Sequence, residues 1–347
     1  MVFLSSFRVL VVVAIGAFGL WACSSDRTTS SEVIVYASVD RAIAEPILDR
    51  FEQQTSIKVR AVFDTEANKT TGLVNRLIAE ASRPQADVFW SGEIGQTVRL
   101  SRIGMFAPYK QSTENELSRR FVAADNTWHA FSARARVLLV NTEQVAVEET
   151  PQFAEGLVDE RWKDRIAIAD PHFGTTGTHL SALLQAWGET RFRDWLKGLR
   201  ENRIRVLPGN AQVRDAVVNG LVAAGLTDSD DAAEAVSRGA PVRVVYLRQS
   251  ADFGVVMIPN TVALVRGAAN VSSAARLADY LLSQDTESQM VAIESAFFPT
   301  RPGVGSAEAR ERVTDSDPKE YETLADAQPR MLEMIETVWL QGNTRSP

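Results

Sequence analysis

Acidic side chains lie directly after several of the apolar segments of this chain. Asp40 follows the first such segment, and Glu93 follows the third. Asp230 and Asp231 come after a later one. In an open sheet of parallel strands, ligands bind beyond the carboxyl ends of the strands. These side chains are therefore expected to bring up to four negative charges to one crevice.

Such a cluster favours a positively charged ligand. Like charges about 4 Å apart repel each other by roughly 4 kcal/mol even at an effective dielectric constant near 20. Carboxylate oxygens are hard ligands for hard cations, so a ferric ion, another hard metal or a protonated amine would relieve the repulsion. The alternative for residues 228–231 is a helix N-terminus, where Ser and Asp side chains cap free amides. Both roles can hold at once.

A segment rich in glycine and threonine, residues 174–179 (GTTGTH), lies between a predicted strand and a predicted helix. Small residues let a ligand approach the backbone, hydroxyls donate hydrogen bonds, and a helix N-terminus offers free N–H groups. This combination suits an anion such as phosphate, phosphonate or carboxylate. The expected contacts are Thr175, Thr176, Gly177 and Thr178. An ordinary capping turn is the alternative, and the lack of a following Gly-Lys-Ser/Thr excludes a P-loop.

Other polar residues at strand ends are further candidates for ligand contact. They are Ser38, Glu66, Ser91 and Asp228. On a strand predicted to cross between two domains, Arg136 is expected to contact the ligand, and Arg134 could add positive charge.

The N-terminal residues 1–22 have the features of an export signal. Arg8 precedes the apolar run Val9–Leu20, which at about 12 residues is too short for the roughly 20 that span a bilayer. The run ends in LWAC and resembles a lipobox, in which the cysteine, here Cys23, is acylated. The alternative is a plain secretory peptide with an incidental cysteine. Residues 23–32 are expected to form a flexible tether because they are rich in Ser and Thr.

Composition narrows the class of protein. The chain has 347 residues, of which 45% are hydrophobic and 23% charged, with a net charge of −7. These values are typical of a soluble globular protein with about two domains at roughly 150 residues each. The excess of acidic over basic residues argues against nucleic-acid binding. Because Cys23 is the single cysteine, the exported domain has no thiol for catalysis.

Hydrophobic periodicity predicts two series of alternating strands and helices. The first series has strands at 33–36, 58–63 and 86–90 and helices at 44–54 and 71–81. After a crossing strand at 136–141, the second has strands at 165–169, 203–207 and 223–226 and helices at 179–187 and 211–218. Strands at 242–246 and 255–265 are expected to return to the first domain, followed by helices at 274–283 and 286–293 and a mostly helical tail from 306. This order predicts α/β domains with mostly parallel sheets.

The order of four motifs resembles the family-1 extracellular solute-binding proteins of ABC transporters, most closely the branch of periplasmic ferric-iron-binding proteins. The motifs are VYASVD at 35–40, ADVFW at 86–90, GTTG at 174–177, and Asn210 with 223–231. The resemblance implies a two-domain, type II periplasmic-binding-protein fold with mixed, mostly parallel sheets, flanking helices and a ligand cleft between the domains. The implied domains are 33–135 with 243–293, and 136–242 with 294–347.

The resemblance also implies a ligand set. Asp40 matches a metal-ligating histidine of the iron-binding members, and Glu93 matches a glutamate ligand. Asp230 and Asp231 match a pair of tyrosine ligands, so the phenolates of the family are replaced by carboxylates. Asn210 matches an asparagine that contacts the anion. These four acidic residues are thus the expected metal ligands.

The function that follows is capture of a ligand by hinge closure and delivery to an ABC permease and ATPase complex, without catalysis. Ferric iron with phosphate or a similar anion is the first expectation for the cargo, with no obligatory cofactor. The protein is expected to be a monomer in the periplasm or at the cell surface, attached to the membrane only through a lipid on Cys23. It is not expected to bind nucleic acid.

Three alternatives remain open at this point. The cargo could instead be a phosphonate, an aminoalkylphosphonate or another small zwitterion, because an acidic patch facing an anion site would bind both ends. A hydrolase outside the cytoplasm would need a nucleophile with its base or a catalytic metal site, and the chain has neither Gly-x-Ser-x-Gly nor HExxH. A sensor lipoprotein would have the same binding domains and a different partner.

Overall fold

The computed structural model describes residues 31–64, 71–111, 117, 119–293, 296–307 and 321–340. The expected signal segment, Cys23, most of the expected tether and Glu66 therefore lie outside the described residues. Residues 31–347 form one compact unit. Across the described part of the chain, every helix is too short or too polar to cross a lipid bilayer.

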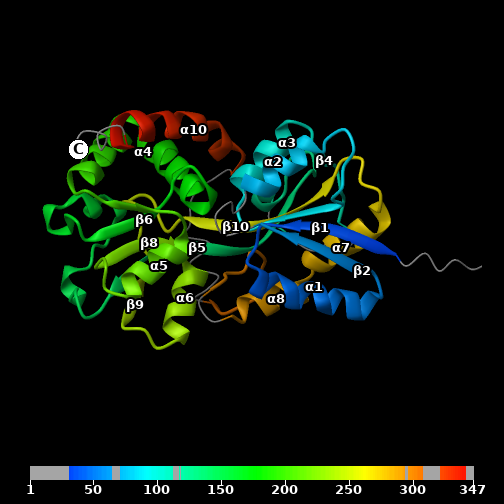
Figure 1. The fold of residues 1–347 in the computed structure, drawn as a ribbon, viewed down its shortest axis with the longest axis horizontal. Coiled ribbons are helices and arrows are strands. Elements are labelled where there is room, and N and C mark those ends of the chain that lie inside the picture. Colours follow the sequence, from blue (N-terminus) through cyan, green and yellow to red (C-terminus); the bar gives the residue numbers. More distant parts are fainter. Residues whose placement is uncertain are drawn as a thin grey trace, which may run out of the picture. The chain divides into compact units, whose positions relative to one another are not determined.

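Strands and helices alternate along most of the chain (Figure 1). The strands are β1 (Glu32–Ala37), β2 (Lys58–Phe63), β3 (Val88–Ser91), β4 (Phe106–Ala107), β5 (His129–Asn141), β6 (Ile166–Ala169), β7 (Arg205–Leu207), β8 (Ala224–Asp228), β9 (Val242–Val245) and β10 (Met257–Val265). The α-helices are α1 (Arg41–Thr55), α2 (Thr71–Ala79), α3 (Gly95–Arg102), α4 (Gly174–Glu201), α5 (Asn210–Val218), α6 (Ser229–Ser237), α7 (Val271–Leu281), α8 (Gln284–Val291) and α10 (Tyr321–Met334). Short helical turns are η2 (Arg119–Phe121), η3 (Val147–Glu149), η4 (Ala154–Val158), η5 (Glu160–Trp162) and η6 (Ile335–Leu340).

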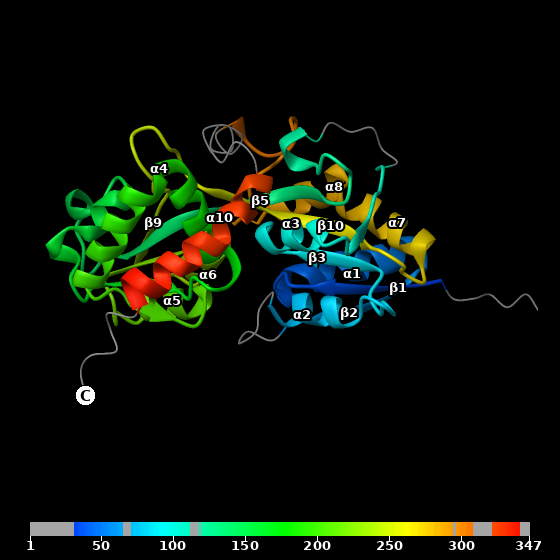
Figure 2. The same cartoon turned by 90° about the horizontal axis from the view of Figure 1, so that it is seen from above.

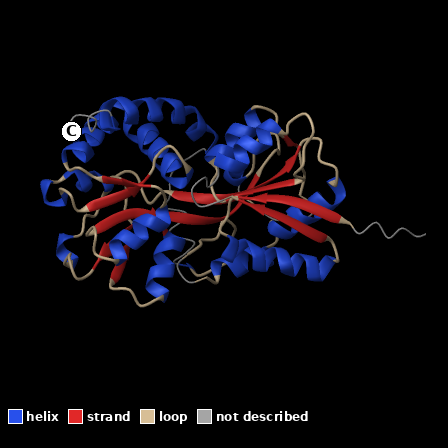
Figure 3. Cartoon of the chain, viewed as in Figure 1, coloured by secondary structure: helices blue, strands red, loops and turns tan. Residues whose placement is uncertain are grey.

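The strands form a mixed ten-stranded sheet in the order β2-β1-β3-β10-β5-β8-β6-β7, with β4 paired to β10 and β9 paired to β5 (Figure 3). Strands β1, β2 and β3 are parallel to one another, and so are β6, β7 and β8. Every antiparallel pair in the described chain involves β5 or β10. We call β1–β4 with β10 the first half of the sheet and β6–β9 the second half.

Strand β5 joins the two halves. Its residues up to Ala135 pair with β10, whereas those from Arg136 onward pair with β8 and β9. The predicted crossing strand at 136–141 is confirmed as a strand, but it begins earlier, at His129, because an apolar and small-residue pattern continues back through Ala130 and Ala133, which are both fully buried. The crossing point lies between Ala135 and Arg136.

Helices cover both faces of the first half of the sheet (Figure 3). Alternating side chains of one strand point to opposite faces, so Val88 and Trp90 of β3 pack with α1, α7 and α8, while Phe89 packs with α2 and α3. This double burial explains the uninterrupted apolar run that marked the strand in the sequence.

Two predictions about the second half of the sheet are wrong in detail. The segment 174–178 was expected to be a loop before a helix, but α4 already begins at Gly174, so its threonines lie in the first turns of a helix. Strand β9 was expected to return the chain to the first domain, but it pairs with the part of β5 that belongs to the second half. The return occurs only at β10. The other predicted elements are present within a few residues of their expected ends.

The C-terminal helix α10 lies across α4 and α3, which belong to different halves of the structure (Figures 1 and 2). Ion pairs tie it to both. Arg102 of α3 binds Asp326 at 2.5 Å, and Arg330 binds Glu189 of α4 at 2.6 Å. The tail is thus helical, as predicted, and it bridges the two halves.

A buried ion pair holds α8 against the crossing strand. The carboxylate of Glu287 is fully buried, and it accepts hydrogen bonds from the backbone N–H of Ser132, from Thr300 and from the guanidinium of Arg301 at 2.5 Å. Removing one partner of a buried pair leaves the other charge uncompensated.

We therefore expect Glu287→Gln to lower the free energy of unfolding by about 3–5 kcal/mol, because Arg301 stays buried without its counter-charge. Urea unfolding followed by circular dichroism measures this. Glu45→Gln is the control, since Glu45 pairs with Arg41 on the surface and should change stability by less than about 1 kcal/mol. Equal effects of the two substitutions on the free energy of unfolding would contradict this account of the buried Glu287–Arg301 pair.

Candidate functional site

A cavity of about 940 Å³ opens beside the N-termini of α1 and α6. Its lining comes from both halves of the sheet: α1 and the segment after α8 on one side, and α5, α6 and the residues around β9 on the other. Three of the four expected metal ligands, Asp40, Asp230 and Asp231, line it. The cavity is therefore the candidate ligand site.

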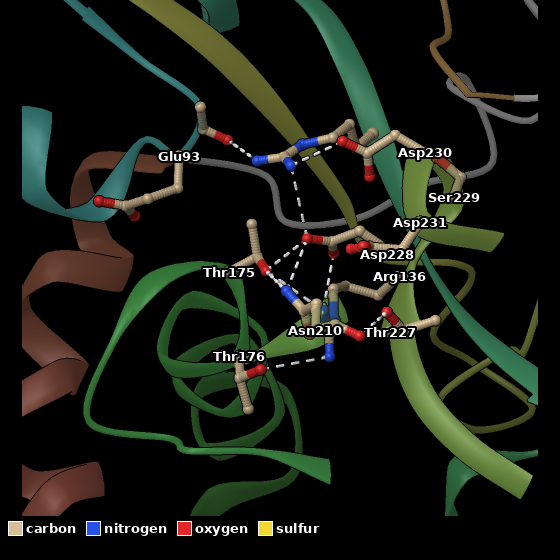
Figure 4. Close-up of polar contacts among 12 residues, drawn as sticks. Glu93, Arg136, Thr175, Thr176, Asn210, Thr227, Asp228, Ser229, Asp230 and Asp231 are labelled. Carbon is tan, nitrogen blue, oxygen red and sulfur yellow. Dashed lines mark hydrogen bonds and ion pairs between the residues drawn. The ribbon is translucent and has the colours of Figure 1, made fainter. Parts of the chain in front are cut away.

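At the base of α6, Arg136 and Asp228 form a buried hub (Figure 4). Arg136 Nη1 donates to Asp228 Oδ1 at 2.7 Å, and neither side chain is more than 1% exposed. The second oxygen of Asp228 accepts from Thr175 Oγ1 at 2.6 Å and from Asn210 Nδ2 at 2.9 Å. Arg136 also donates to Thr175, Thr176 and the side-chain oxygen of Asn210.

Electrostatics keep this hub ionised. Burial alone would raise the pKa of Asp228, but the charges of Arg136 and Arg134, together with the hydrogen bond from Thr175, outweigh it and lower the pKa. Burial and the neighbouring Arg136 lower the pKa of His179 to about 3. His179 is therefore neutral and can accept from Arg136 at Nδ1 while Nε2 faces the Gln249 side-chain oxygen at 2.8 Å.

Arg134 connects the hub to the first half of the structure. Its Nη1 lies 2.9 Å from Asp230 Oδ2 and 3.6 Å from Asp228 Oδ2, and its Nη2 donates to the carbonyl of Gly92. A Cβ at position 92 would lie 2.9 Å from this nitrogen, so glycine there makes room for the guanidinium. Burial opposes the charge of Arg134, but Asp230, Asp228 and Asp40 hold its pKa above the ordinary value.

Asp230 is the least satisfied charge of the site. Its side chain is 7% exposed, and Oδ1 has no hydrogen-bond partner among the described residues. Burial raises the pKa of Asp230, with Asp228 and Asp40 adding to the effect, although Arg134 acts in the opposite direction. Asp228, Asp230 and Asp231 present carboxylate oxygens within 4.8 Å of one another. A cation beside these carboxylates would relieve their mutual repulsion.

The alternative role expected for residues 228–231, capping of a helix N-terminus, is only partly supported. Asp228 occupies the N-cap position of α6, but its side chain makes no capping hydrogen bond because it is directed to Arg136 and Thr175. Asp230 and Asp231 lie in the first turn of α6, where negative charge is favourable to the helix dipole. Asp231 also lies 3.5 Å from Arg214 Nη1.

Glu93 does not join the acidic group, contrary to the expectation (Figure 4). It is 2% exposed, and its two oxygens accept from the backbone N–H groups of Gly95 and Gln96 at the start of α3 and from Thr178 Oγ1 at 2.8 Å. Burial raises its pKa, and these hydrogen bonds act against the rise. Glu93 is a helix-capping residue that also links α3 to α4.

The expected anion contacts are engaged with protein groups. Thr175 and Thr176 bind Arg136, and Thr178 binds Glu93. A Cβ at Gly177 would lie 2.8 Å from the carbonyl oxygen of Pro171, so this glycine permits close packing of α4. The prediction that these side chains face an anion is therefore not supported by their contacts.

The two predicted serines hold the loop after β3. Ser38 Oγ lies 3.2 Å from Ser91 Oγ and accepts from the backbone N–H of Gly92, while Ser91 donates to the carbonyl of Glu93. Both are buried. They position the loop that receives Arg134 and do not line the cavity.

Sequence reasoning missed several residues of the cavity. Arg41, Arg214 and Tyr246 line it, as do the apolar side chains Val236 and Ile293. Arg41 was detectable in principle because it directly follows Asp40 at a strand end. The others lie within α5 or α6, just after β9 or just after α8, and only the tertiary structure brings them to the site.

We expect Asp228→Asn to lower the free energy of unfolding at neutral pH by about 3–5 kcal/mol, because Arg136 would stay buried without its counter-charge. The pKa of Asp228 is lowered in the folded protein, so its contribution is complete above about pH 4, the ordinary range of an aspartate. The contribution is lost as the pH falls through the folded value. Chemical unfolding of wild type and variant between pH 3 and 7 tests this.

Asp215→Asn is the matched control, because Asp215 also pairs with an arginine but is 54% exposed. It should change the stability by less than about 1 kcal/mol at any pH. If the difference in unfolding free energy between wild type and Asp228→Asn does not shrink toward pH 3, the conclusion that the hub is ionised would be contradicted.

Comparison with known proteins identifies the class. The family model of bacterial extracellular solute-binding proteins matches residues 32–290, so the chain belongs to this family. Its members are solute-binding transport proteins that deliver a ligand to an ABC permease.

Individual relatives have low sequence identity to this chain. The major ferric iron-binding protein of Neisseria meningitidis is 27% identical over 282 residues, covering 80% of this chain and 83% of the relative. Among solved structures, iron-bound HitA from Pseudomonas aeruginosa matches with a TM-score of 0.79 at 21% identity, covering 89% of this chain and all of that one. The apo ferric ion-binding protein A of Pasteurella haemolytica has the same TM-score at 20% identity and covers 91% and 100%. These likenesses confirm the predicted two-domain, type II periplasmic-binding-protein fold.

Proposed function

We propose that this protein is the solute-binding component of an ABC importer, and that its cargo is ferric iron bound together with a non-protein anion. It captures the cargo in the cavity between the two halves and closes over it by motion about β5 and β10, the strands through which the halves are joined. It acts as a monomer and delivers the cargo to a permease and ATPase complex.

The observation that carries the proposal is that Asp40, Asp230 and Asp231 line one cavity, and that Asp230 Oδ1 is buried without a hydrogen-bond partner among the described residues. A buried carboxylate without a full set of partners must either take up a proton or meet a cation. Asp230, Asp231 and Asp40 line one cavity, so a hard cation there would gain oxygen ligands and relieve their mutual repulsion.

The relatives support iron as the metal. Several are named ferric iron-binding proteins or iron uptake proteins, including iron uptake protein A1 of Synechocystis, 26% identical over 286 residues. The coordination would differ from a phenolate site, because Asp230 and Asp231 stand where the resemblance places tyrosines.

The other candidates receive less support. A phosphonate would need free hydroxyls at the start of α4, and Thr175, Thr176 and Thr178 are bonded to Arg136, Asp228 and Glu93 instead. A hydrolase is disfavoured by membership of a transport family. A sensor role differs from import only in the partner that receives the loaded protein.

We expect Asp230→Ala to weaken the binding of ferric iron at least tenfold, a loss of about 1.4 kcal/mol or more, because it removes a cavity-lining carboxylate whose Oδ1 has no hydrogen-bond partner among the described residues. Binding is measured by calorimetry at pH 7 on metal-stripped protein, with Fe(III) supplied as its citrate complex in phosphate buffer. Affinity of the wild type should fall as the pH is lowered through the raised pKa of Asp230, since a protonated carboxyl no longer ligates a metal.

Asp215→Ala serves as the control because Asp215 lines the same cavity but belongs to α5 and is more exposed. It should alter ferric affinity by less than threefold. The assignment of Asp230 as a ligand would be refuted if Asp230→Ala bound ferric iron as tightly as the wild type does. It would also be refuted if Asp215→Ala weakened ferric binding to the same extent as Asp230→Ala.

We further propose that the mature chain begins at Cys23 and is held at the membrane by a lipid on its sulfur. The LWAC sequence supports this, and Ser24–Glu32 would supply a tether. In a bacterial host, wild-type protein should partition into the detergent phase of Triton X-114 and Cys23→Ser into the aqueous phase. Aqueous partition of both forms would point to the plain secretory peptide instead.

A further inference from the structure

The loop between β3 and α3, residues 92–94, is held in place by hydrogen bonds within the first half of the structure. Ser91 Oγ donates to the carbonyl of Glu93 at 2.7 Å, and the backbone N–H of Gly92 donates to Ser38 Oγ at 3.2 Å. The carboxylate of Glu93 accepts from two backbone N–H groups at the start of α3, at 2.7 and 2.8 Å. This carboxylate is therefore fixed in one orientation by its own half.

A further hydrogen bond to the same carboxylate comes from the second half. Thr178, near the start of α4, donates from Oγ1 to Glu93 Oε2 at 2.8 Å. Glu93 is 2% exposed and Thr178 is 3% exposed, so water does not compete for the bond. Parting the halves would break it, and a lost buried hydrogen bond changes an equilibrium by roughly tenfold.

The two helix ends fit closely around this bond. A Cβ at position 95, in the first turn of α3, would lie 3.0 Å from Thr178 Oγ1 and 3.1 Å from Glu93 Oε2. Gly95 is therefore required by the close approach of α3 to α4. Even one added methyl group would push the two helices apart by a few tenths of an ångström.

The same loop also meets a second helix of the second half. The carbonyl of Gly92 accepts from Arg134, and the other end of that guanidinium pairs with Asp230 of α6 at 2.9 Å. The neighbouring residues Gly92 and Glu93 thus connect the first half to α6 and to α4. This makes the loop after β3 a contact point between the halves beside the strand that joins them.

Helix α10 also crosses from one half to the other on the face that carries α3 and α4 (Figure 1). Its ion pair to α3 joins Arg102 and Asp326, whose side chains are 41% and 68% exposed. Exposed pairs of this kind contribute little. The buried bond between Glu93 and Thr178 should therefore hold α3 to α4 more firmly than this ion pair does.

We propose that Glu93 and Thr178 are positioning residues that form a latch, which keeps the two halves together before cargo is bound and must break for cargo to enter. This deepens the proposed function, and its consequence for capture rests on that function. When only a fraction of the protein is in the state that can bind, apparent affinity falls by that fraction. The latch thereby limits how readily the protein captures its cargo.

The distance between the halves tests the latch on metal-free protein. Spin labels are placed on Ile78→Cys of α2 and Ala186→Cys of α4, two exposed positions, in a chain whose single native cysteine is replaced by Cys23→Ser. Double electron–electron resonance then measures the label separation. We expect Thr178→Val, which removes the hydroxyl and keeps the shape, to raise the fraction of a longer distance at least fivefold.

Matched variants separate the latch from a general loosening of α4. Thr176→Val is the control, because Thr176 is also buried in α4 but its hydroxyl accepts from Arg136 within the second half. It should leave the distances as in wild type, and so should Thr178→Ser, which keeps the donor. Gly95→Ala, which crowds the same bond from α3, should act in the same direction as Thr178→Val.

The latch is overturned if Thr178→Val and Gly95→Ala both give the wild-type distances, or if Thr176→Val opens the protein as much as Thr178→Val does. It is also overturned if Arg102→Gln, which breaks the ion pair to α10, opens the protein more than Thr178→Val.

The rate of ferric citrate binding, followed by stopped-flow absorbance, tests the link to capture. It should be at least threefold faster in Thr178→Val than in wild type and unchanged in Thr176→Val. An unchanged rate in an opened Thr178→Val protein overturns the link between latch and capture. If ferric citrate does not bind to the wild type at all, the proposed cargo is wrong, whereas the distances in metal-free protein still decide whether the latch exists.

Discussion

The site is organised around one buried carboxylate that two arginines of the same strand share. Arg134 and Arg136 are two residues apart on β5, so their side chains leave the strand on the same face. Asp228 lies 2.7 Å from Arg136 and 3.6 Å from Arg134. Because the chain crosses from one half of the sheet to the other between these arginines, the same charge cluster sits at the junction of both halves. A buried cluster of this kind is tolerated only when its members stay paired.

This arrangement determines which acidic groups remain for a ligand. Both oxygens of Asp228 accept hydrogen bonds within the hub, and those of Glu93 accept hydrogen bonds from the start of α3 and from Thr178. Asp230 is half satisfied by Arg134, and its other oxygen is buried without a hydrogen-bond partner among the described residues. Neither Asp228 nor Glu93 lines the cavity, whose carboxylates come from the N-terminus of α1, from α5 and from α6: Asp40, Asp215, Asp230, Asp231 and Glu234.

Much of the fold was predictable because each element depends on a short local pattern. Strand β3 was recognisable because it is buried on both faces and therefore apolar throughout, and α5 because its apolar residues recur at helical spacing. The start of α4 was placed too late because threonine and glycine are weak helix formers, whereas tertiary contacts of Thr175 and Thr178 hold those turns in the helix. The placement of β9 failed for a related reason: a strand's sequence carries no information about which neighbour it pairs with.

By itself the sequence determined the class of fold, the transport family and the acidic character of the site. All three depend on the order of elements and on residue types at strand ends, where a parallel sheet gathers polar side chains. Only the tertiary structure decided which carboxylates are engaged by other parts of the protein. Glu93, Asp228 and Asp230 look equivalent along the chain, yet long-range contacts with Thr178, Arg136 and Arg134 satisfy the first two and leave Asp230 half satisfied. Pairing between residues separated by tens to hundreds of positions sets the charge of a buried group, and local sequence does not encode it.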